Sequence, residues 1–233
     1  MGGKDQNMIY FEKVTREYPN GTTALKDINL HIKPKEFVTI VGTSGAGKST
    51  LLKCIYMDDK PTHGKIFVGG VDLTNLKKSD IPYLRRKIGV VFQDYKLLPQ
   101  KTIYENAAFA LEAAGMPTKE IKNRVPKILQ LVGLSSKAES FPNELSGGEQ
   151  QRVGIARAVI GQPKILIADE PTGNLDPKNA WEIIELLLKI NQYGTTVVMT
   201  THNREIVNAI KKRVITINQG RVAKDQEIGR YAI

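Results

Sequence analysis

The segment at residues 42–49 constrains the fold of this chain more than any other feature. It reads Gly-Thr-Ser-Gly-Ala-Gly-Lys-Ser, and it lies between an apolar run at 37–41 and a helical pattern at 48–56. A glycine-rich loop between a strand and a helix turns backbone N–H groups toward phosphate oxygens, and the helix N-terminus adds partial positive charge. The sequence therefore predicts an α/β fold with a phosphate-binding loop.

This loop predicts a nucleotide site for ATP with Mg²⁺. Lys48 is expected to place its charge beside the β- and γ-phosphates, and the Ser49 hydroxyl is expected to bind the metal. The residues expected to contact the nucleotide here are Gly42, Thr43, Ser44, Gly45, Ala46, Gly47, Lys48, Ser49 and Thr50.

Apolar β-branched segments alternate with segments of helical periodicity, which is typical of a parallel sheet built from strand–helix–strand units. Strands are expected at 9–15, 37–41, 65–68, 88–92, 164–168, 196–200 and 214–218. Helices are expected at 48–56, 103–114, 118–132, 149–160, 180–191 and 204–211. The turn signals Asn20-Gly21 and Gly69-Gly70 favour an additional antiparallel β-layer at the N-terminal side.

The organisation along the chain follows from where the strand pattern stops. Between Gln93 and Gly161 only helical patterns occur, which indicates a helical subdomain inserted into the sheet. We expect one domain over residues 1–233, with an α/β nucleotide-binding core at 1–92 and 162–233 and the helical subdomain at 93–161. The length of 233 residues, with 41% hydrophobic and 25% charged residues, suits such a globular domain and excludes a disordered chain.

Two carboxylates, Asp169 and Glu170, follow the apolar strand expected at 164–168. A strand that is apolar throughout is buried on both faces, and its carboxyl end opens at the crevice where such sheets bind ligands. Asp169 is therefore expected to hold Mg²⁺, and Glu170 to polarise an attacking water. Alone, such a strand end is more often only solvated, but the phosphate loop upstream favours the catalytic reading.

The segment at 145–152, Leu-Ser-Gly-Gly-Glu-Gln-Gln-Arg, is a second glycine-rich helix start. In isolation it reads as a capped helix N-terminus. It resembles the signature motif of ATP-binding-cassette ATPases, and it lies in the expected order between the phosphate loop and the Asp-Glu strand. The resemblance extends from about Met8 to about Val222 and implies an ATPase with the fold of that family, a P-loop core with an antiparallel layer and a helical insertion.

The resemblance also implies roles for isolated residues. Gln93 is similar to the glutamine that contacts Mg²⁺ and links the nucleotide to a transmembrane partner. His202 is similar to the switch histidine that contacts the γ-phosphate. Residues Asn174-Leu175-Asp176 are similar to the D-loop of the family. Tyr18 lies where relatives place an aromatic ring on adenine.

A head-to-tail homodimer that forms with ATP is a further implication of the resemblance. Each ATP is then held between the phosphate loop of one subunit and Ser146, Gly147 and Gly148 of the other. Glu170, His202 and Lys48 are the expected catalytic residues, and Ser49, Gln93 and Asp169 the expected metal ligands.

The form of two segments narrows the resemblance to one subclass. Residues 169–176, Asp-Glu-Pro-Thr-Gly-Asn-Leu-Asp, resemble members whose integral membrane partners transmit mechanical work, and residues 84–98 are most similar to the members that act in cell division. Lipoprotein-release and macrolide-efflux ATPases are the alternative, since they share every catalytic residue. Tyr95, Leu97 and Leu98 are expected either to meet the membrane subunit or to belong to the core.

The location is expected to be the cytoplasmic side of the cell membrane. No window approaches the roughly 18 apolar residues of a spanning helix, the first residues lack the apolar region of a secretory signal, and the single cysteine, Cys54, suits a reducing compartment. The net charge is +10, and the basic residues at 211–213, Arg221 and Lys224 form either a peripheral contact with anionic lipid or a solvated face.

The sequence also bears on two other classes of protein, nucleic-acid machines and nucleotide sensors. The basic chain could belong to a nucleic-acid machine built on the same cassette, but repair members carry a long coiled coil before the signature and translation factors carry two cassettes. No nucleic-acid partner is therefore expected. A nucleotide sensor without hydrolysis is hard to reconcile with Glu170.

Overall fold

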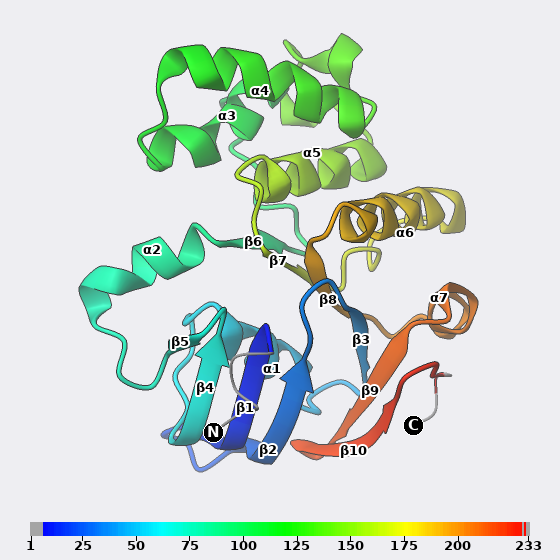
Figure 1. Cartoon of the computed structure of the whole chain (residues 1–233). Coiled ribbons are helices and arrows are strands. Elements are labelled where there is room, and N and C mark those ends of the chain that lie inside the picture. Colours follow the sequence, from blue (N-terminus) through cyan, green and yellow to red (C-terminus); the bar gives the residue numbers. More distant parts are fainter. Residues whose placement is uncertain (1–6, 230, 232–233) are drawn as a thin grey trace.

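Two β-sheets form the lower part of the molecule in the computed structural model, which describes residues 7–229 and 231 (Figure 1). A six-stranded sheet has the order β10-β9-β3-β8-β7-β6, and a four-stranded sheet the order β2-β1-β4-β5. The strands are β1 (Ile9–Glu17), β2 (Thr23–Ile32), β3 (Phe37–Val41), β4 (His63–Val68), β5 (Val71–Asp72), β6 (Ile88–Val91), β7 (Ile165–Asp169), β8 (Thr196–Thr200), β9 (Arg213–Asn218) and β10 (Arg221–Gln226).

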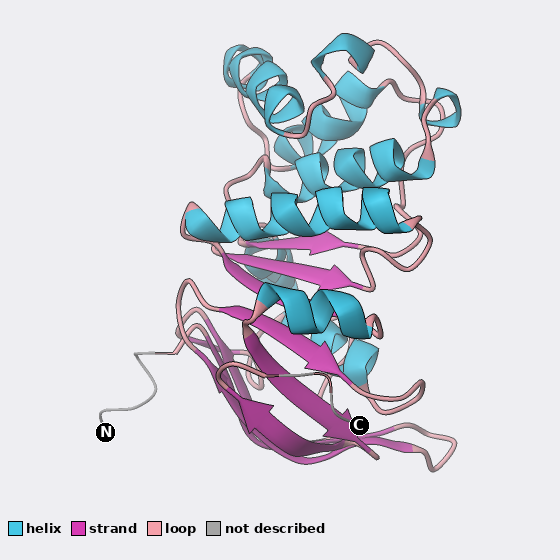
Figure 2. Cartoon of the chain, turned by 90° about the vertical axis from the view of Figure 1, so that its right-hand side faces the viewer, coloured by secondary structure: helices cyan, strands magenta, loops and turns pink. Residues whose placement is uncertain are grey.

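Helices cover both faces of the larger sheet, and the helices within residues 103–159 form the upper part of the molecule (Figures 1 and 2). They are α1 (Lys48–Ile55), α2 (Ile81–Arg85), α3 (Ile103–Ala113), α4 (Thr118–Leu131), α5 (Gly147–Val159), α6 (Pro177–Gln192) and α7 (Arg204–Ile210). Short 3-10 turns lie at Lys78–Asp80, Ser135–Lys137 and Pro142–Glu144. Within 93–161, where every residue is described, there are helices and turns but no strand.

The strand β7 shows how the sheet is buried on both faces. Successive side chains of a strand point to opposite faces. Ile165 and Ile167 join a core with α1 and the four-stranded sheet. Leu166 and Ala168 join the other core, which is formed with α3, α4, α5 and α6. The apolar run expected at this position is therefore a strand between two hydrophobic layers.

The strands β3 and β6–β9 are parallel, and β10 pairs antiparallel with β9 at the edge. The expected antiparallel layer is confirmed, since β1 pairs antiparallel with both β2 and β4. The expected turns are present as well: Gly21, Gly69 and Gly70 all have positive φ, which glycine adopts without steric cost.

Three strands and one helix are not predicted by the sequence patterns: β2, β5, β10 and α2, of which β5 has only two residues. In β2 the residue Asp27 has a φ of 51°, and the register with β1 shifts near it, so that the apolar alternation breaks between Leu25 and Ile28. The edge strand β10 is mostly exposed and polar. The helix α2 has only five residues, too few for a helical period to show.

One buried amide fixes the loop that enters the helical segment. Asn106 on α3 is fully buried; its Oδ1 accepts a hydrogen bond from the Leu98 N–H at 2.8 Å, and its Nδ2 donates to the carbonyl oxygens of Leu98, Lys101 and Thr102 at 3.0, 2.9 and 3.0 Å. Thr102 and Glu105 add a reciprocal cap at the start of α3. The chain from 98 to 102 is therefore held by side-chain bonds rather than by a sheet.

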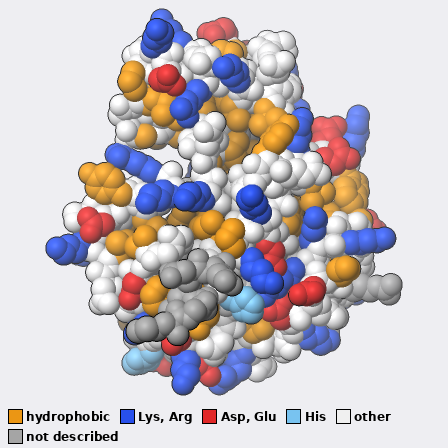
Figure 3. Space-filling model, viewed as in Figure 1, with side chains coloured by type: hydrophobic (Ala, Val, Ile, Leu, Met, Phe, Trp, Pro, Cys, Tyr) orange, Lys and Arg blue, Asp and Glu red, His pale blue; other side chains and the backbone are white. Residues whose placement is uncertain are grey.

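The basic side chains are spread over the surface, and a row of them crosses the middle of the face in Figure 3, below the helical part. One member of the expected lipid-contacting cluster is not available. Arg213 is 8% exposed and is paired with Glu36 and Asp225 at 2.9 and 2.7 Å, and these bonds raise its pKa.

Among the described residues, no helix is both long and apolar enough to cross a bilayer.

We predict that Asn106→Leu destabilises the protein by about 1–3 kcal/mol, because it leaves the Leu98 N–H and several carbonyl groups without their partner. The measurement is urea unfolding at equilibrium. Asn123→Leu is the control, because Asn123 is exposed on α4 and its replacement should change the free energy of unfolding by no more than about 0.5 kcal/mol. Equal stability of the two variants would show that the Asn106 bonds do not hold the loop.

Candidate functional site

The phosphate loop begins where the fully buried strand β3 ends, and it closes at the first residue of α1. Two of its glycines have no room for a side chain. A Cβ on Gly42 would strike the carbonyl oxygen of Ile217, and one on Gly47 would strike that of Ala24; both residues have positive φ. The glycines at these two positions thus allow the loop to pack closely against β9 and β2.

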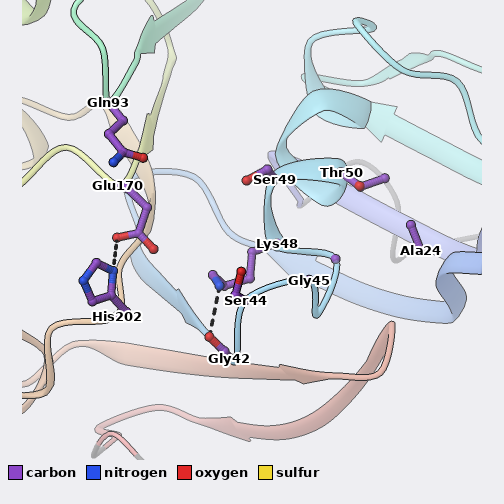
Figure 4. A pocket seen from close by; sticks show the side chains of 11 residues that line it. Ala24, Gly42, Ser44, Gly45, Lys48, Ser49, Thr50, Gln93, Glu170 and His202 are labelled. Atoms are coloured by element: carbon purple, nitrogen blue, oxygen red, sulfur yellow. Dashed lines mark hydrogen bonds and ion pairs between the residues drawn. The ribbon is translucent and has the colours of Figure 1, made fainter. Parts of the chain in front are cut away.

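Lys48 lies inside this loop. Its Nζ donates hydrogen bonds to the carbonyl oxygens of Gly42 and Thr43 at 3.0 and 3.1 Å (Figure 4). No side chain caps the N-terminus of α1. The ammonium group and the positive end of the helix dipole therefore meet at one place, which is a favourable site for a phosphate chain.

Asp169 lies at the carboxyl end of β7, beside the start of α1. The Ser49 hydroxyl donates a hydrogen bond to Asp169 Oδ1 at 3.3 Å. One hydroxyl and one carboxylate oxygen are ligands that Mg²⁺ prefers, and this metal commonly takes its remaining ligands from water and phosphate. Among the described residues there is no group of three or more His, Cys, Asp or Glu that could hold a metal ion. The oxygen atoms of Ser49 and Asp169 fit a magnesium ion that takes its other ligands from a nucleotide and from water.

Glu170 and His202 face each other across the site. The Nδ1 atom of His202 lies 2.9 Å from Glu170 Oε2, and the His202 side chain is 68% exposed whereas that of Glu170 is 16% exposed (Figure 4). Glu170 has a φ of 46°, a left-handed conformation that residues other than glycine rarely adopt. Such conformations concentrate at functional sites.

Gln93 follows β6 and points toward the loop after β7. Its Nε2 donates to Asn174 Oδ1 at 3.5 Å, and Asn174 Nδ2 donates back to the Gln93 carbonyl oxygen at 3.3 Å. In this arrangement the Gln93 amide is tied to residue 174 rather than to Ser49 or Asp169.

A cavity of about 380 Å³ lies between the phosphate loop and the side chains of Gln93, Glu170 and His202, and it is large enough for a nucleotide. Figure 4 shows the phosphate loop on one side and Gln93, Glu170 and His202 on the other. The lining residues are Ala24, Gly42, Ser44, Gly45, Gly47, Lys48, Ser49, Thr50, Gln93, Glu170 and His202. Of the residues expected in the phosphate loop, Thr43 and Ala46 do not line the cavity.

Tyr18 lies next to the cavity and is held by polar contacts. Its hydroxyl donates to Asp59 Oδ2 at 2.6 Å and lies 3.3 Å from Thr50 Oγ1, and the guanidinium of Arg16 stacks at 4.6 Å from the ring centroid. Arg16 and Asp59 form an ion pair at 2.6 Å. The ring orientation is therefore fixed without a ligand, with a cation on one of its faces.

Ser146, Gly147 and Gly148 do not line the cavity of their own chain. They form the N-terminus of α5, where Ser146 and Glu149 make a capping box and Lys137 pairs with Glu149 at 2.8 Å. The hydrogen bonds from Lys137 and from Ser146 lower the pKa of Glu149 to about 2. At neutral pH the Glu149 carboxylate at this helix start is therefore charged, and it accepts a hydrogen bond from the Ser146 hydroxyl.

Three structural features of the site were not expected from the sequence. Ala24 lines the cavity only because β2 passes beside the phosphate loop. Asp59 and Arg16 hold Tyr18 through contacts between distant segments, and a single sequence carries no signal for them. Thr200, at the end of β8, contacts both Asp169 and Glu170. Its position two residues before His202 is a sequence signal that could have placed it near the site.

The comparisons with known proteins agree with this geometry. The sequence pattern of the ABC transporter family matches residues 25–173. The chain is 55% identical over 225 residues to the cell division ATP-binding protein FtsE of Streptococcus pneumoniae serotype 2 (strain D39), with 97% of this chain and 98% of the relative covered. Its identity to the protein of the same name from Escherichia coli K12 is 47% over 213 residues, with 91% and 96% covered.

Solved structures are similar as well. A dimeric structure of a post-hydrolysis state of the ATP-binding cassette MJ0796, bound to ADP and Pi, has a TM-score of 0.87 and 38% identity, and covers 96% of this chain and 100% of that chain. A second dimeric structure of MJ0796, described as a bacterial ABC transporter cassette, has a TM-score of 0.87 and 39% identity, with the same coverage. The expected fold and family are confirmed. The chain belongs to the ABC transporter family, and it is an ATP-binding cassette that hydrolyses ATP.

Proposed function

We propose that this ATPase is the nucleotide-hydrolysing subunit of a membrane complex that controls cell-wall hydrolysis in bacterial cell division. Its partner is an integral membrane subunit similar to FtsX, and the ATPase acts peripherally at the cytoplasmic side of the cell membrane. The observation that carries the proposal is the 55% identity, over nearly the full length of both chains, to a relative named for cell division. Macrolide-efflux and lipoprotein-release ATPases are the alternative, and only the partner separates the two.

The phosphate loop binds the nucleotide. Lys48 neutralises the β- and γ-phosphates, and the N–H groups of the loop cradle their oxygens. Ser49, Asp169 and Gln93 would hold Mg²⁺, and the ion would neutralise the charge that develops on the phosphates. The 3.3 Å separation of the Ser49 and Asp169 oxygens supports this assignment; Gln93 has to leave Asn174 to take part.

Glu170 is the general base. Its carboxylate lines the cavity, and it accepts the proton of a water that attacks the γ-phosphate. His202, 2.9 Å from that carboxylate, orients it in the free subunit and turns to the γ-phosphate when ATP is bound. Tyr18 stacks on adenine with the ring face that Arg16 leaves open.

The site is completed by a second copy. Ser146, Gly147 and Gly148 lie outside the cavity of their own chain, yet they form a glycine-lined helix N-terminus, whose backbone N–H groups suit phosphate. We assign them to the nucleotide of the partner subunit in a head-to-tail dimer formed with ATP. The helical segment 93–161 thus acts as a subdomain that carries these residues, on the core formed by 1–92 and 162–233.

We predict that Glu170→Gln lowers steady-state ATP hydrolysis by about a hundredfold or more, because the amide keeps the shape but cannot accept a proton. ATP binding remains, and the variant accumulates as a dimer with ATP in size-exclusion chromatography. Lys48→Ala is the matched comparison: it loses binding and hydrolysis together, because the charge beside the phosphates is gone. Hydrolysis by Glu170→Gln at the wild-type rate would contradict the role of Glu170.

Gly147→Asp tests the dimer. A Cβ at Gly147 lies 3.0 Å from the Tyr95 hydroxyl, the end of a flexible side chain, so the subunit should still fold. The new carboxylate repels the phosphates of the partner's nucleotide, and the expected result is normal ATP binding without dimer formation. The measurement is light scattering with ATP in the Glu170→Gln background. A dimer that still forms with ATP would remove the signature segment from the interface.

A further prediction concerns the membrane partner. Tyr95, Leu97 and Leu98 are all half-buried, and Leu97 packs against the core, so Leu98 and Tyr95 are the residues to test. We predict that Leu98→Asp or Tyr95→Ala weakens co-purification with a co-expressed FtsX-like subunit, while ATP binding and the melting temperature change little, because buried apolar anchors dominate such interfaces. Undiminished co-purification would place docking elsewhere, and a large fall in melting temperature would assign these side chains to the core.

A further inference from the structure

A buried threonine lies between the two carboxylate residues of the site. Thr200 is the last residue of β8, and it is paired with Asp169, the last residue of β7, in the parallel ladder. Paired residues in neighbouring strands point to the same face, so the Thr200 side chain lies beside that of Asp169. Its exposed fraction is 0%.

The hydroxyl of Thr200 makes two hydrogen bonds of different direction. The Glu170 backbone N–H donates to Thr200 Oγ1 at 2.9 Å, so the oxygen accepts there. The single hydroxyl hydrogen is then free for Asp169 Oδ1, which lies at 2.6 Å. One side chain thereby holds the carboxylate of the first residue and the backbone of the second.

Both bonds constrain geometry that hydrolysis depends on. Asp169 Oδ1 has a second donor in Ser49, but at the longer distance of 3.3 Å, so Thr200 is the closer constraint on this carboxylate. Glu170 has a φ of 46°, and the bond from its N–H to Thr200 fixes the turn that aims its side chain at His202. A strained conformation persists only where its surroundings over-determine it.

We propose that Thr200 is a positioning residue for ATP hydrolysis: its hydroxyl sets the orientation of the Asp169 carboxylate toward Mg²⁺ and the backbone of Glu170 toward the attacking water. The inference rests on the proposed roles of Asp169 and Glu170. Thr200 does not line the cavity, and it acts only through its two neighbours.

The test compares Thr200→Ser with Thr200→Ala, which differ by one oxygen atom. Thr39 provides the matched control, because it is equally buried in the adjacent strand β3, and its hydroxyl has no hydrogen-bond partner within the described part of the chain. Thr39→Ser and Thr39→Ala therefore make the same change in buried side-chain volume without removing a hydrogen bond to Asp169 or Glu170. Alanine is chosen over valine because a methyl group 2.6 Å from Asp169 Oδ1 would clash.

Three quantities are measured on the full chain: kcat and KM for ATP, the Mg²⁺ dependence of binding of a non-hydrolysable ATP analogue by calorimetry, and the melting temperature. We expect Thr200→Ala to lower kcat about tenfold relative to Thr200→Ser, since hydrogen bonds to charged groups are of that strength. KM should change little, and the gain in analogue affinity on addition of Mg²⁺ should shrink. The two Thr39 variants should have equal kcat.

Equal kcat and equal Mg²⁺ dependence in Thr200→Ser and Thr200→Ala would overturn the inference. So would a fall in kcat of the same size in Thr39→Ala, because loss of volume alone would then explain it. Glu170→Gln is assayed in parallel: if that variant hydrolyses ATP, the proposed role of Glu170 fails, whereas if it is inactive and the Thr200 pair is equal, only the role of Thr200 fails. Because calorimetry reports binding at temperatures below any melting transition, a less stable Thr200→Ala still gives a result.

Discussion

Burial of the parallel strands on both faces is the constraint on which the site depends. The strand β7 is fixed by two different cores, with Ile165 and Ile167 on one side and Leu166 and Ala168 on the other. Its register therefore cannot slip by one residue without moving four apolar side chains to the wrong layer. Because parallel strands end at the same edge, this register places Asp169 beside Thr200 and brings the phosphate loop after β3 to the same crevice.

The phosphate loop and the start of α5, which are proposed to meet one nucleotide in a dimer, differ in their charged side chains. The phosphate loop presents Lys48, whose ammonium group is already held by two carbonyl oxygens, and thus a cation that needs little reorganisation when phosphate arrives. The start of α5 presents a Ser146 hydroxyl that is engaged with Glu149. The pKa of Glu149 is lowered to about 2, so this carboxylate stays charged at neutral pH. Donation from Ser146 to a phosphate across a dimer would require its hydroxyl hydrogen to leave Glu149 Oε2, while its oxygen can still accept from the Glu149 N–H and cap the helix.

The sequence was informative wherever a pattern is local. The phosphate loop, the buried strand before Asp169 and the turns at Gly21 and Gly69 depend on neighbours in the chain, and the structure has them where they were expected. What depends on contact between distant segments could not be seen. The bulge at Asp27 hides the period of β2, and the bonds from Thr200 to two carboxylate residues arise from strand pairing across 31 positions. The sequence indicates a surface cation at Arg213, but in the structure this residue pairs with Asp225 on β10 and with Glu36 before β3.

The helix α5 connects the helical segment to the cavity by two routes. Arg157 donates to the carbonyl oxygens of Tyr95 and Lys96 at 3.0 and 2.6 Å, two consecutive residues of positive φ that follow Gln93 by two and three positions. Gln151, fully buried, donates to the Pro171 carbonyl oxygen at 2.7 Å, next to Glu170. A displacement of α5 would therefore act on two parts of the cavity wall that faces the phosphate loop, the loop of Gln93 and the turn after β7. The same helix begins at the segment proposed to meet the partner's nucleotide, so under that proposal one helix would carry both the contacts that complete one site and those that shape the other.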